Sequence, residues 1–187
     1  LAGKVKAIQQ RLLAARASRP APLRDDKILT AWNGLMISAY AQAAFAFDEP
    51  GYADAAGQAA RFILDRMRID GRLQRSSLAG IASGEGYLDD YAFLIAGLID
   101  LYEATGEIDW LQQGIALSGV LDSHFANPAG GYYLTADDHE GLIVRQQPAY
   151  DSAEPSGNSV QVMNLLRLHE FTTDDAYRVR AERCFSA

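Results

Sequence analysis

Two adjacent carboxylates, Asp89 and Asp90, stand at the start of a long apolar segment, and Glu154 precedes a later one. Carboxyl groups act as general acids and bases, and glycoside hydrolysis needs two of them beside the scissile bond. Neighbouring residues of a helix point about 100° apart, so Asp89 and Asp90 cannot both face one cavity. We therefore expect acid and base to come from different clusters. The pairs to test join Asp89 or Asp90 to Asp26, Asp151 or Glu154.

Other polar and aromatic residues cluster near these carboxylates. Carboxylates and amides bind hydroxyl groups, and aromatic faces stack on the C–H surfaces of sugars. This mixture predicts a polyhydroxylated small-molecule ligand, such as a sugar. Helix capping is a competing explanation, and for Asp89, Asp90 or Ser156 taken singly it is the stronger one. The candidate substrate-binding residues are Asp26, Trp32, Asn33, Tyr91, Arg145, Ser156 and Asn158.

The histidines and the single cysteine are less suited to this chemistry. His124 and His169 fall late in predicted helices, and His139 lies in an acidic loop, so each is expected to be structural or exposed. That loop, residues 137–140, lacks a recognised metal-ligand spacing. Cys184 has no partner for a disulfide. We expect no metal and no cofactor, and a reducing, cytoplasmic location.

The overall charge limits the classes of partner. The net charge is −7, whereas nucleic acids and anionic membranes bind basic surfaces. No apolar run approaches the roughly 20 residues that a membrane span needs. The sequence therefore predicts a globular protein that binds neither nucleic acid nor membrane.

Helices with two kinds of hydrophobic pattern must position the candidate residues. The segments 30–47, 87–104 and 156–170 are the inner helices, and the first two are apolar nearly all round, which predicts burial on every side. An amphipathic segment follows each of them, at 52–67, 108–125 and 174 to the end. Residues 1–18 form a further amphipathic helix. The register supports a repeat, because Asn33, Tyr91 and Asn158 each lie 19 residues before an aromatic residue that opens the following helix.

This alternation predicts an all-α protein, an α/α-hairpin toroid with inner helices forming a ring and outer helices wrapping it. The N-termini of the inner helices then point to one face, where the polar clusters converge. Short strands at 71–75, 130–135 and 142–145 are expected between the hairpins, the last two as a β-hairpin. Residues 1–187 supply about three and a half hairpins by our count, whereas such rings usually have six. We therefore expect an incomplete fragment whose partners include the remainder of its own ring.

Three motifs resemble a known family when they occur in this order: residues 24–36 (Arg-Asp-Asp-Lys-Ile-Leu-Thr-Ala-Trp-Asn-Gly-Leu-Met), residues 88–92 (Leu-Asp-Asp-Tyr-Ala) and residues 154–159 (Glu-Pro-Ser-Gly-Asn-Ser). Over residues 19–175 the chain resembles the C-terminal helical region of the thioredoxin-domain-containing family, which includes the spermatogenesis-associated homologues and the bacterial YyaL-like proteins. The resemblance implies a six-hairpin toroid similar to N-acylglucosamine 2-epimerases and six-hairpin glycosidases. It also implies a thioredoxin-like domain in the full protein that this chain lacks.

Two functions are compatible with these features. The first is a carbohydrate-active or carbohydrate-binding toroid, either a glycosidase or a sugar epimerase or isomerase. In it Asp89, Asp90 and Glu154 are the acid and base candidates. The second is a non-enzymatic binding or scaffolding module that works with the thioredoxin-like domain. A deep pocket with two carboxyl groups favours the first, and a shallow aromatic groove favours the second.

Overall fold

The computed structural model describes residues 2–139 and 141–185. Residue 1 of the predicted helix 1–18 and residues 186 and 187 of the predicted last helix lie outside this part, as does Glu140. The helices are α1 (Ala2–Ala17), α2 (Thr30–Phe47), α3 (Pro50–Arg66), α4 (Leu88–Thr105), α5 (Ile108–His124), α6 (Gly157–Thr172) and α7 (Asp175–Phe185). The strands are β1 (Ile28–Leu29), β2 (Arg68–Ile69), β3 (Arg72–Leu78) and β4 (Ile81–Glu85).

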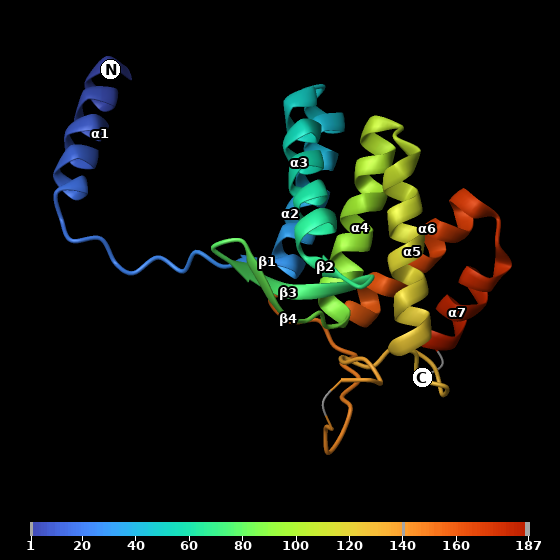
Figure 1. Cartoon of the computed structure of the whole chain (residues 1–187). Coiled ribbons are helices and arrows are strands. Elements are labelled where there is room, and N and C mark those ends of the chain that lie inside the picture. Colours follow the sequence, from blue (N-terminus) through green and yellow to red (C-terminus); the bar gives the residue numbers. More distant parts are fainter. Residues whose placement is uncertain (1, 140, 186–187) are drawn as a thin grey trace.

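Six of the helices form three hairpins, α2/α3, α4/α5 and α6/α7, as the sequence predicts (Figure 1). Helix α4 packs against α2 on one side and α6 on the other, so these three form an inner layer. Helices α3, α5 and α7 each pack on their own inner partner. None of the helices in the described part of the chain combines the length and the apolar character needed to cross a bilayer.

Close contact between α2 and α4 depends on glycine. A Cβ atom on Gly34 would lie 2.6 Å from the backbone nitrogen of Leu94, and one on Gly97 would lie 2.8 Å from the carbonyl oxygen of Gly34. Two backbones can approach this closely only where side chains are absent. Helix α4 is buried nearly all round, as predicted, and most of its residues from Leu88 to Leu101 belong to the core.

Helix α2 is buried on one face only, so the prediction of burial on every side is wrong for it. The side chains of Trp32, Met36, Phe45 and Phe47 are 57%, 52%, 84% and 72% exposed. The physical reason is that α2 contacts α3 and α4, and no described helix covers its remaining side. Helix α1 stands apart from the hairpins (Figure 1). Its apolar side chains are exposed as well.

A small antiparallel sheet lies at the end of the hairpins where α2 and α4 begin (Figure 1). Strand β3 is central and pairs with β1, β2 and β4, so the predicted strand at 71–75 is present and longer than expected. Strand β1 ends immediately before α2 begins, and the pairing of Ile28 with Ser77 holds it against β3. The sheet therefore sets where the first inner helix starts.

The predicted hairpin of residues 130–135 and 142–145 is wrong. That region has one isolated bridge, between Ala126 and Tyr132, and no strand among its described residues. The backbone groups of Tyr132 bond the side-chain amide of Asn158, with its N–H donating over 2.8 Å and its carbonyl accepting over 2.9 Å. Gly130 and Gly131 also have positive φ angles, of 122° and 73°, which a strand does not tolerate.

The exposed apolar face of α2 predicts self-association of this chain. Isolated monomers rarely expose contiguous apolar patches of this kind. Sedimentation velocity over a range of concentrations should show reversible association, weakened in Phe45→Ser/Phe47→Ser. The matched control is Ile143→Ser, which removes a fully exposed apolar side chain from a loop. A monomer at all concentrations, or an equal response of control and double variant, would contradict the prediction.

Candidate active site

Asp90 fastens the start of α4 to the start of α2. Its carboxylate accepts one hydrogen bond from the backbone N–H of Tyr87 (2.8 Å) and another from that of Ala31 (3.0 Å). The first N–H satisfies the N-terminus of α4 itself, whereas the second belongs to the first turn of α2. Arg75 on β3 approaches the same carboxylate at 3.5 Å. Asp90 is 1% exposed, so it links these elements from a buried position.

Asp89 makes the corresponding link to α6. The backbone N–H of Gly157, the first residue of α6, donates to the Asp89 carboxylate. A Cβ atom on Gly157 would lie 2.3 Å from Asp89 Oδ1 and 2.8 Å from Leu88 Cγ, so only glycine fits here. Ser156 precedes it and caps α6 by accepting from Asn158 N (3.2 Å). The start of α6 is thereby held against the start of α4.

Glu154 and Trp32 complete the junction. The indole N–H of Trp32, in the first turn of α2, donates to Glu154 Oε1 over 2.7 Å, although the two residues are far apart in sequence. The three clusters that the sequence places at the inner-helix N-termini are thus brought together. They border a cavity of about 210 Å³ lined by Leu29, Ala31, Trp32, Arg75, Asp89, Asp90 and Glu154.

Burial raises the pKa values of the two aspartates that line the cavity. Burial raises the pKa of Asp90 to about 6, although the N–H of Tyr87 and the charge of Arg75 act in the opposite direction. Burial also raises the pKa of Asp89, and the charge of Glu154 adds to the effect, whereas the N–H of Gly157 and the charge of Arg75 oppose it. Carboxyl groups with raised pKa values beside a cavity are candidates for acid–base chemistry.

Three of the predicted binding residues lie outside this cavity. Tyr91 is 1% exposed, its hydroxyl accepts from Leu73 N (2.9 Å), and its ring packs 5.3 Å from that of Phe125. Asn33 donates its side-chain amide to the carbonyl of Leu29 at 2.8 Å. Asp26 is exposed and pairs with Arg24. In this structure, therefore, the ring of Tyr91 is covered by protein and does not reach the cavity.

The remaining predicted residues hold the loop that precedes α6. Arg145 donates to the carbonyls of Thr135 and His124 and lies 4.1 Å from the ring centroid of Tyr133. Ser156 and Asn158 both donate to the carbonyl of Pro148, at 3.2 and 2.8 Å. These contacts position the segment that carries Glu154, and none of the three residues lines the cavity.

Arg75 lines the cavity but was not among the predicted site residues. The sequence indicated only that side chains alternate along the predicted strand. That pattern does not show which helix the strand lies against, so it could not place Arg75 at the cavity. The guanidinium of Arg75 lies 4.4 Å from the ring centroid of Tyr87. It is therefore held between that ring and the carboxylate of Asp90.

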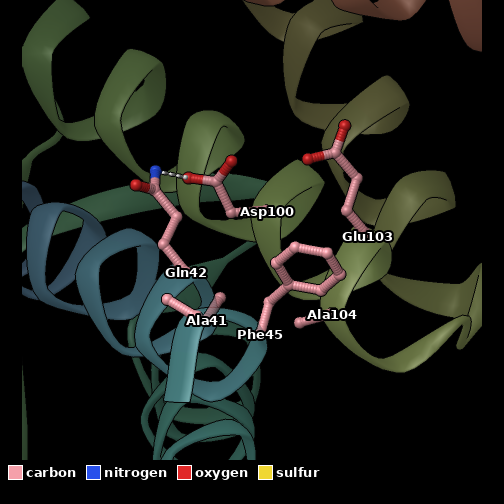
Figure 2. Close-up of a pocket in the computed structure, with 7 residues that line it drawn as sticks. Ala41, Gln42, Phe45, Asp100, Glu103 and Ala104 are labelled. Carbon is pink, nitrogen blue, oxygen red and sulfur yellow. Dashed lines mark hydrogen bonds between the residues drawn. The ribbon is translucent and has the colours of Figure 1, made fainter. Parts of the chain in front are cut away.

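A second polar group that sequence reasoning missed joins the three inner helices nearer their C-termini. Asp100 of α4 accepts from Arg167 of α6 (2.6 Å) and from Ser38 and Gln42 of α2, the last over 3.2 Å. Arg167 also bonds Glu103 at 2.9 Å. Figure 2 shows Gln42 and Asp100 beside a cavity of about 490 Å³ with largely apolar walls. These bonds hold the three inner helices together on the C-terminal side of the candidate site.

A cluster outside the cavity has the ligand types of a metal site. Within the described residues, His124, Asp137 and Asp138 place ligand atoms within 4.8 Å of one another. His139 of the acidic loop is not part of this cluster and contacts Glu85 instead. However, Arg72 bonds both oxygens of Asp138 at 3.0 Å and lowers the pKa of that carboxyl. The arginine therefore already balances the charge that a cation would need.

Comparisons with known proteins relate this chain to larger ones. No family model matches it. It is 40% identical over 176 residues to spermatogenesis-associated protein 20 of mouse, covering 87% of this chain and 22% of that protein. The human protein of the same name is 39% identical over 175 residues, with the same shares. An uncharacterised protein of Caenorhabditis elegans is 37% identical over 180 residues, which cover 91% of this chain and 24% of that protein. The chain thus spans about a quarter or less of these relatives.

Solved structures establish the fold. A cellobiose 2-epimerase from Spirochaeta thermophila matches with a TM-score of 0.68 at 18% identity, over 84% of this chain and 42% of that one. A family 76 α-mannanase from Bacteroides thetaiotaomicron matches with a TM-score of 0.71 at 14% identity, over 89% and 44%. The fold is therefore an α/α toroid, as predicted, and the chain corresponds to less than half of these structures. Identities this low show the fold alone.

Proposed function

We propose that this chain is the toroid region of a protein of the thioredoxin-domain-containing spermatogenesis-associated family, and that its cavity binds and acts on a carbohydrate. Similarity to spermatogenesis-associated protein 20 supports the first part. Two of the solved toroids, by their names, act on sugars: a cellobiose 2-epimerase and an α-mannanase. The observation that carries the proposal is that Trp32, Asp89 and Glu154, one from each inner-helix N-terminus, border a single cavity.

The three residues have different roles in this proposal. Asp89 transfers the proton, because it is half-buried, borders the cavity and has a raised pKa. Glu154 is the second carboxylate, and it also holds the indole of Trp32. Trp32 offers its exposed ring for stacking on a sugar. Asp90 is a positioning residue, since both of its oxygens accept backbone N–H groups.

The cavity favours hydrolysis over epimerisation by histidine. Its described lining has three carboxylates and an arginine, and the histidines of the chain lie elsewhere. His124 contacts Asp137, His139 contacts Glu85, and His169 contacts the carbonyl of Asp174. A carboxylate pair matches the chemistry of glycoside hydrolysis.

Scaffolding is the second candidate, and the exposed apolar face of α2 favours it. Met36, Phe45 and Phe47 offer a surface on which another part of a longer protein could pack. The occupant would be the remainder of the ring or a thioredoxin-like domain. In that case the cavity would bind no sugar, and mutation of its carboxylates would leave partner binding unchanged.

A sugar panel tests the leading proposal. Neutral, amino and acidic mono- and disaccharides are added to the protein, and binding is followed by thermal shift and by the emission of Trp32 in a Trp110→Phe background. At least one sugar should raise the unfolding temperature and change Trp32 emission, and Trp32→Ala should abolish the rise in unfolding temperature. No response to any sugar would overturn the proposal.

A further inference from the structure

Negative groups outnumber positive ones in the lining of the cavity. Three carboxylates face one guanidinium, and that guanidinium is already engaged. Arg75 lies 3.5 Å from Asp90 and stacks on the ring of Tyr87. Arg75 acts on Asp89 as well, so one guanidinium serves two aspartates. With all four groups ionised, the lining has two more negative charges than positive ones, and Glu154 has no basic partner within it.

The basic residues just before α2 do not offset the negative charge of the cavity. Lys27 bonds Asp25 at 3.1 Å, and Arg24 pairs with Asp26, so each is matched by its own carboxylate before α2 begins. Neither lysine nor arginine from that segment lines the cavity.

Asp89 and Glu154 are close enough to affect each other. Both carboxylates line the same cavity, and the charge of Glu154 adds to the burial that disfavours ionised Asp89, although the N–H of Gly157 and the charge of Arg75 act in the opposite direction. A positive ligand group would relieve this repulsion. Trp32 adds a second attraction, because its indole N–H is used by Glu154 while its ring stays more than half exposed. An exposed tryptophan face attracts a cation, and neighbouring carboxylates strengthen that attraction.

We propose that this cavity selects a sugar that carries a free ammonium group, in preference to neutral, N-acylated or acidic sugars. The selectivity rests on the proposed carbohydrate function and adds the chemical class of the ligand. The ammonium group lies among Asp89, Glu154 and the face of Trp32, while the hydroxyls bond the carboxylates. A uronic acid or a sugar phosphate is rejected, since its negative charge would meet two unbalanced carboxylates.

The experiment compares ligands that differ in one substituent. Dissociation constants of glucosamine, N-acetylglucosamine, glucose and glucuronic acid are measured by NMR titration, at a pH where the amine is protonated. We expect glucosamine to bind about tenfold more tightly than its N-acetyl derivative, and glucuronic acid to bind most weakly. The difference should shrink at 0.5 M salt, a concentration at which screening acts over about 4 Å.

Glu154→Gln should reduce the preference for the ammonium group, because it removes one of the two unbalanced charges. The matched control is Asp54→Asn, which removes a carboxylate from the exposed face of α3 and should leave the preference intact. Equal or tighter binding of neutral or acidic sugars, or equal preference in Glu154→Gln and Asp54→Asn, would overturn the selectivity while sugar binding stands. Failure of every sugar to bind would instead overturn the proposed function.

Discussion

Replacing Asp90 with alanine should lower the free energy of unfolding by about 2–4 kcal/mol at pH 4.5. The change leaves the backbone N–H groups of Ala31 and Tyr87 without their acceptor, and each unpaired group in a buried setting costs about 1–3 kcal/mol. It also removes the link between the first turns of α2 and α4. Urea unfolding measures the loss.

The loss should become smaller as the pH rises. The pKa of Asp90 is raised to about 6 in the folded state, above its ordinary value of 3.8, so the folded protein holds this proton more tightly than the unfolded chain. Stability from this group is therefore fully present below pH 4 and is lost as the pH rises through 6. The difference between wild type and Asp90→Ala should shrink by up to about 3 kcal/mol over that window.

Asp54→Ala is the matched control, because it removes an exposed carboxylate of an outer helix. It should change stability little at either pH. If the effect of Asp90→Ala grew with pH instead, the folded-state pKa of Asp90 would be lowered and not raised. If Asp90→Ala lowered the free energy of unfolding equally at pH 4.5 and pH 7, the pKa of Asp90 would be the same in the folded and unfolded protein.

Asp89→Asn should reduce turnover of a sugar substrate by about 10²- to 10⁴-fold, the usual contribution of a general acid or base. Asparagine keeps a carbonyl oxygen that can accept the N–H of Gly157, so the junction of α4 with α6 should survive. Binding of the substrate should change less than turnover. Initial rates are followed by NMR on the sugar from the panel that binds most tightly.

The control for this experiment is Asp109→Asn, an exposed carboxylate in the first turn of an outer helix. It should retain full turnover. Glu154→Gln should lower turnover as well, because the reaction uses two carboxyl groups. Undiminished turnover in Asp89→Asn, with the fold intact by circular dichroism, would remove Asp89 from the chemistry.

The sequence predicts the helices well because each has a strong hydrophobic pattern and clear turns. The bounds of α2 and α4 match the apolar segments to within a residue. The prediction that α2 is buried on every side was wrong. An apolar pattern shows which side chains a helix could bury, whereas the neighbouring elements decide which of them are covered. Phe45 and Phe47 fit the pattern of a buried helix and are exposed here.

The site was predictable in part. The convergence of the inner-helix N-termini follows from the repeat, since equivalent helices in a ring point the same way. Which side chains of an inner helix line the cavity depends on the rotation of that helix about its axis, and the sequence does not determine this rotation. Tyr91 therefore turns into the protein, whereas Asp89 and Asp90 both line the cavity, so the expectation that they could not both face it is wrong. Arg75 reaches the site from β3, and only tertiary packing brings that strand to α4.

A residue-resolved NMR titration with the most tightly bound sugar tests most directly that three helix N-termini form one site. The account predicts that the indole N–H of Trp32 and the backbone N–H groups of Ala31, Asp89 and Gly157 shift together, with one dissociation constant. Resonances of Arg178 on α7 should not move. Shifts at only one of the three N-termini, or different dissociation constants for them, would contradict a single shared site.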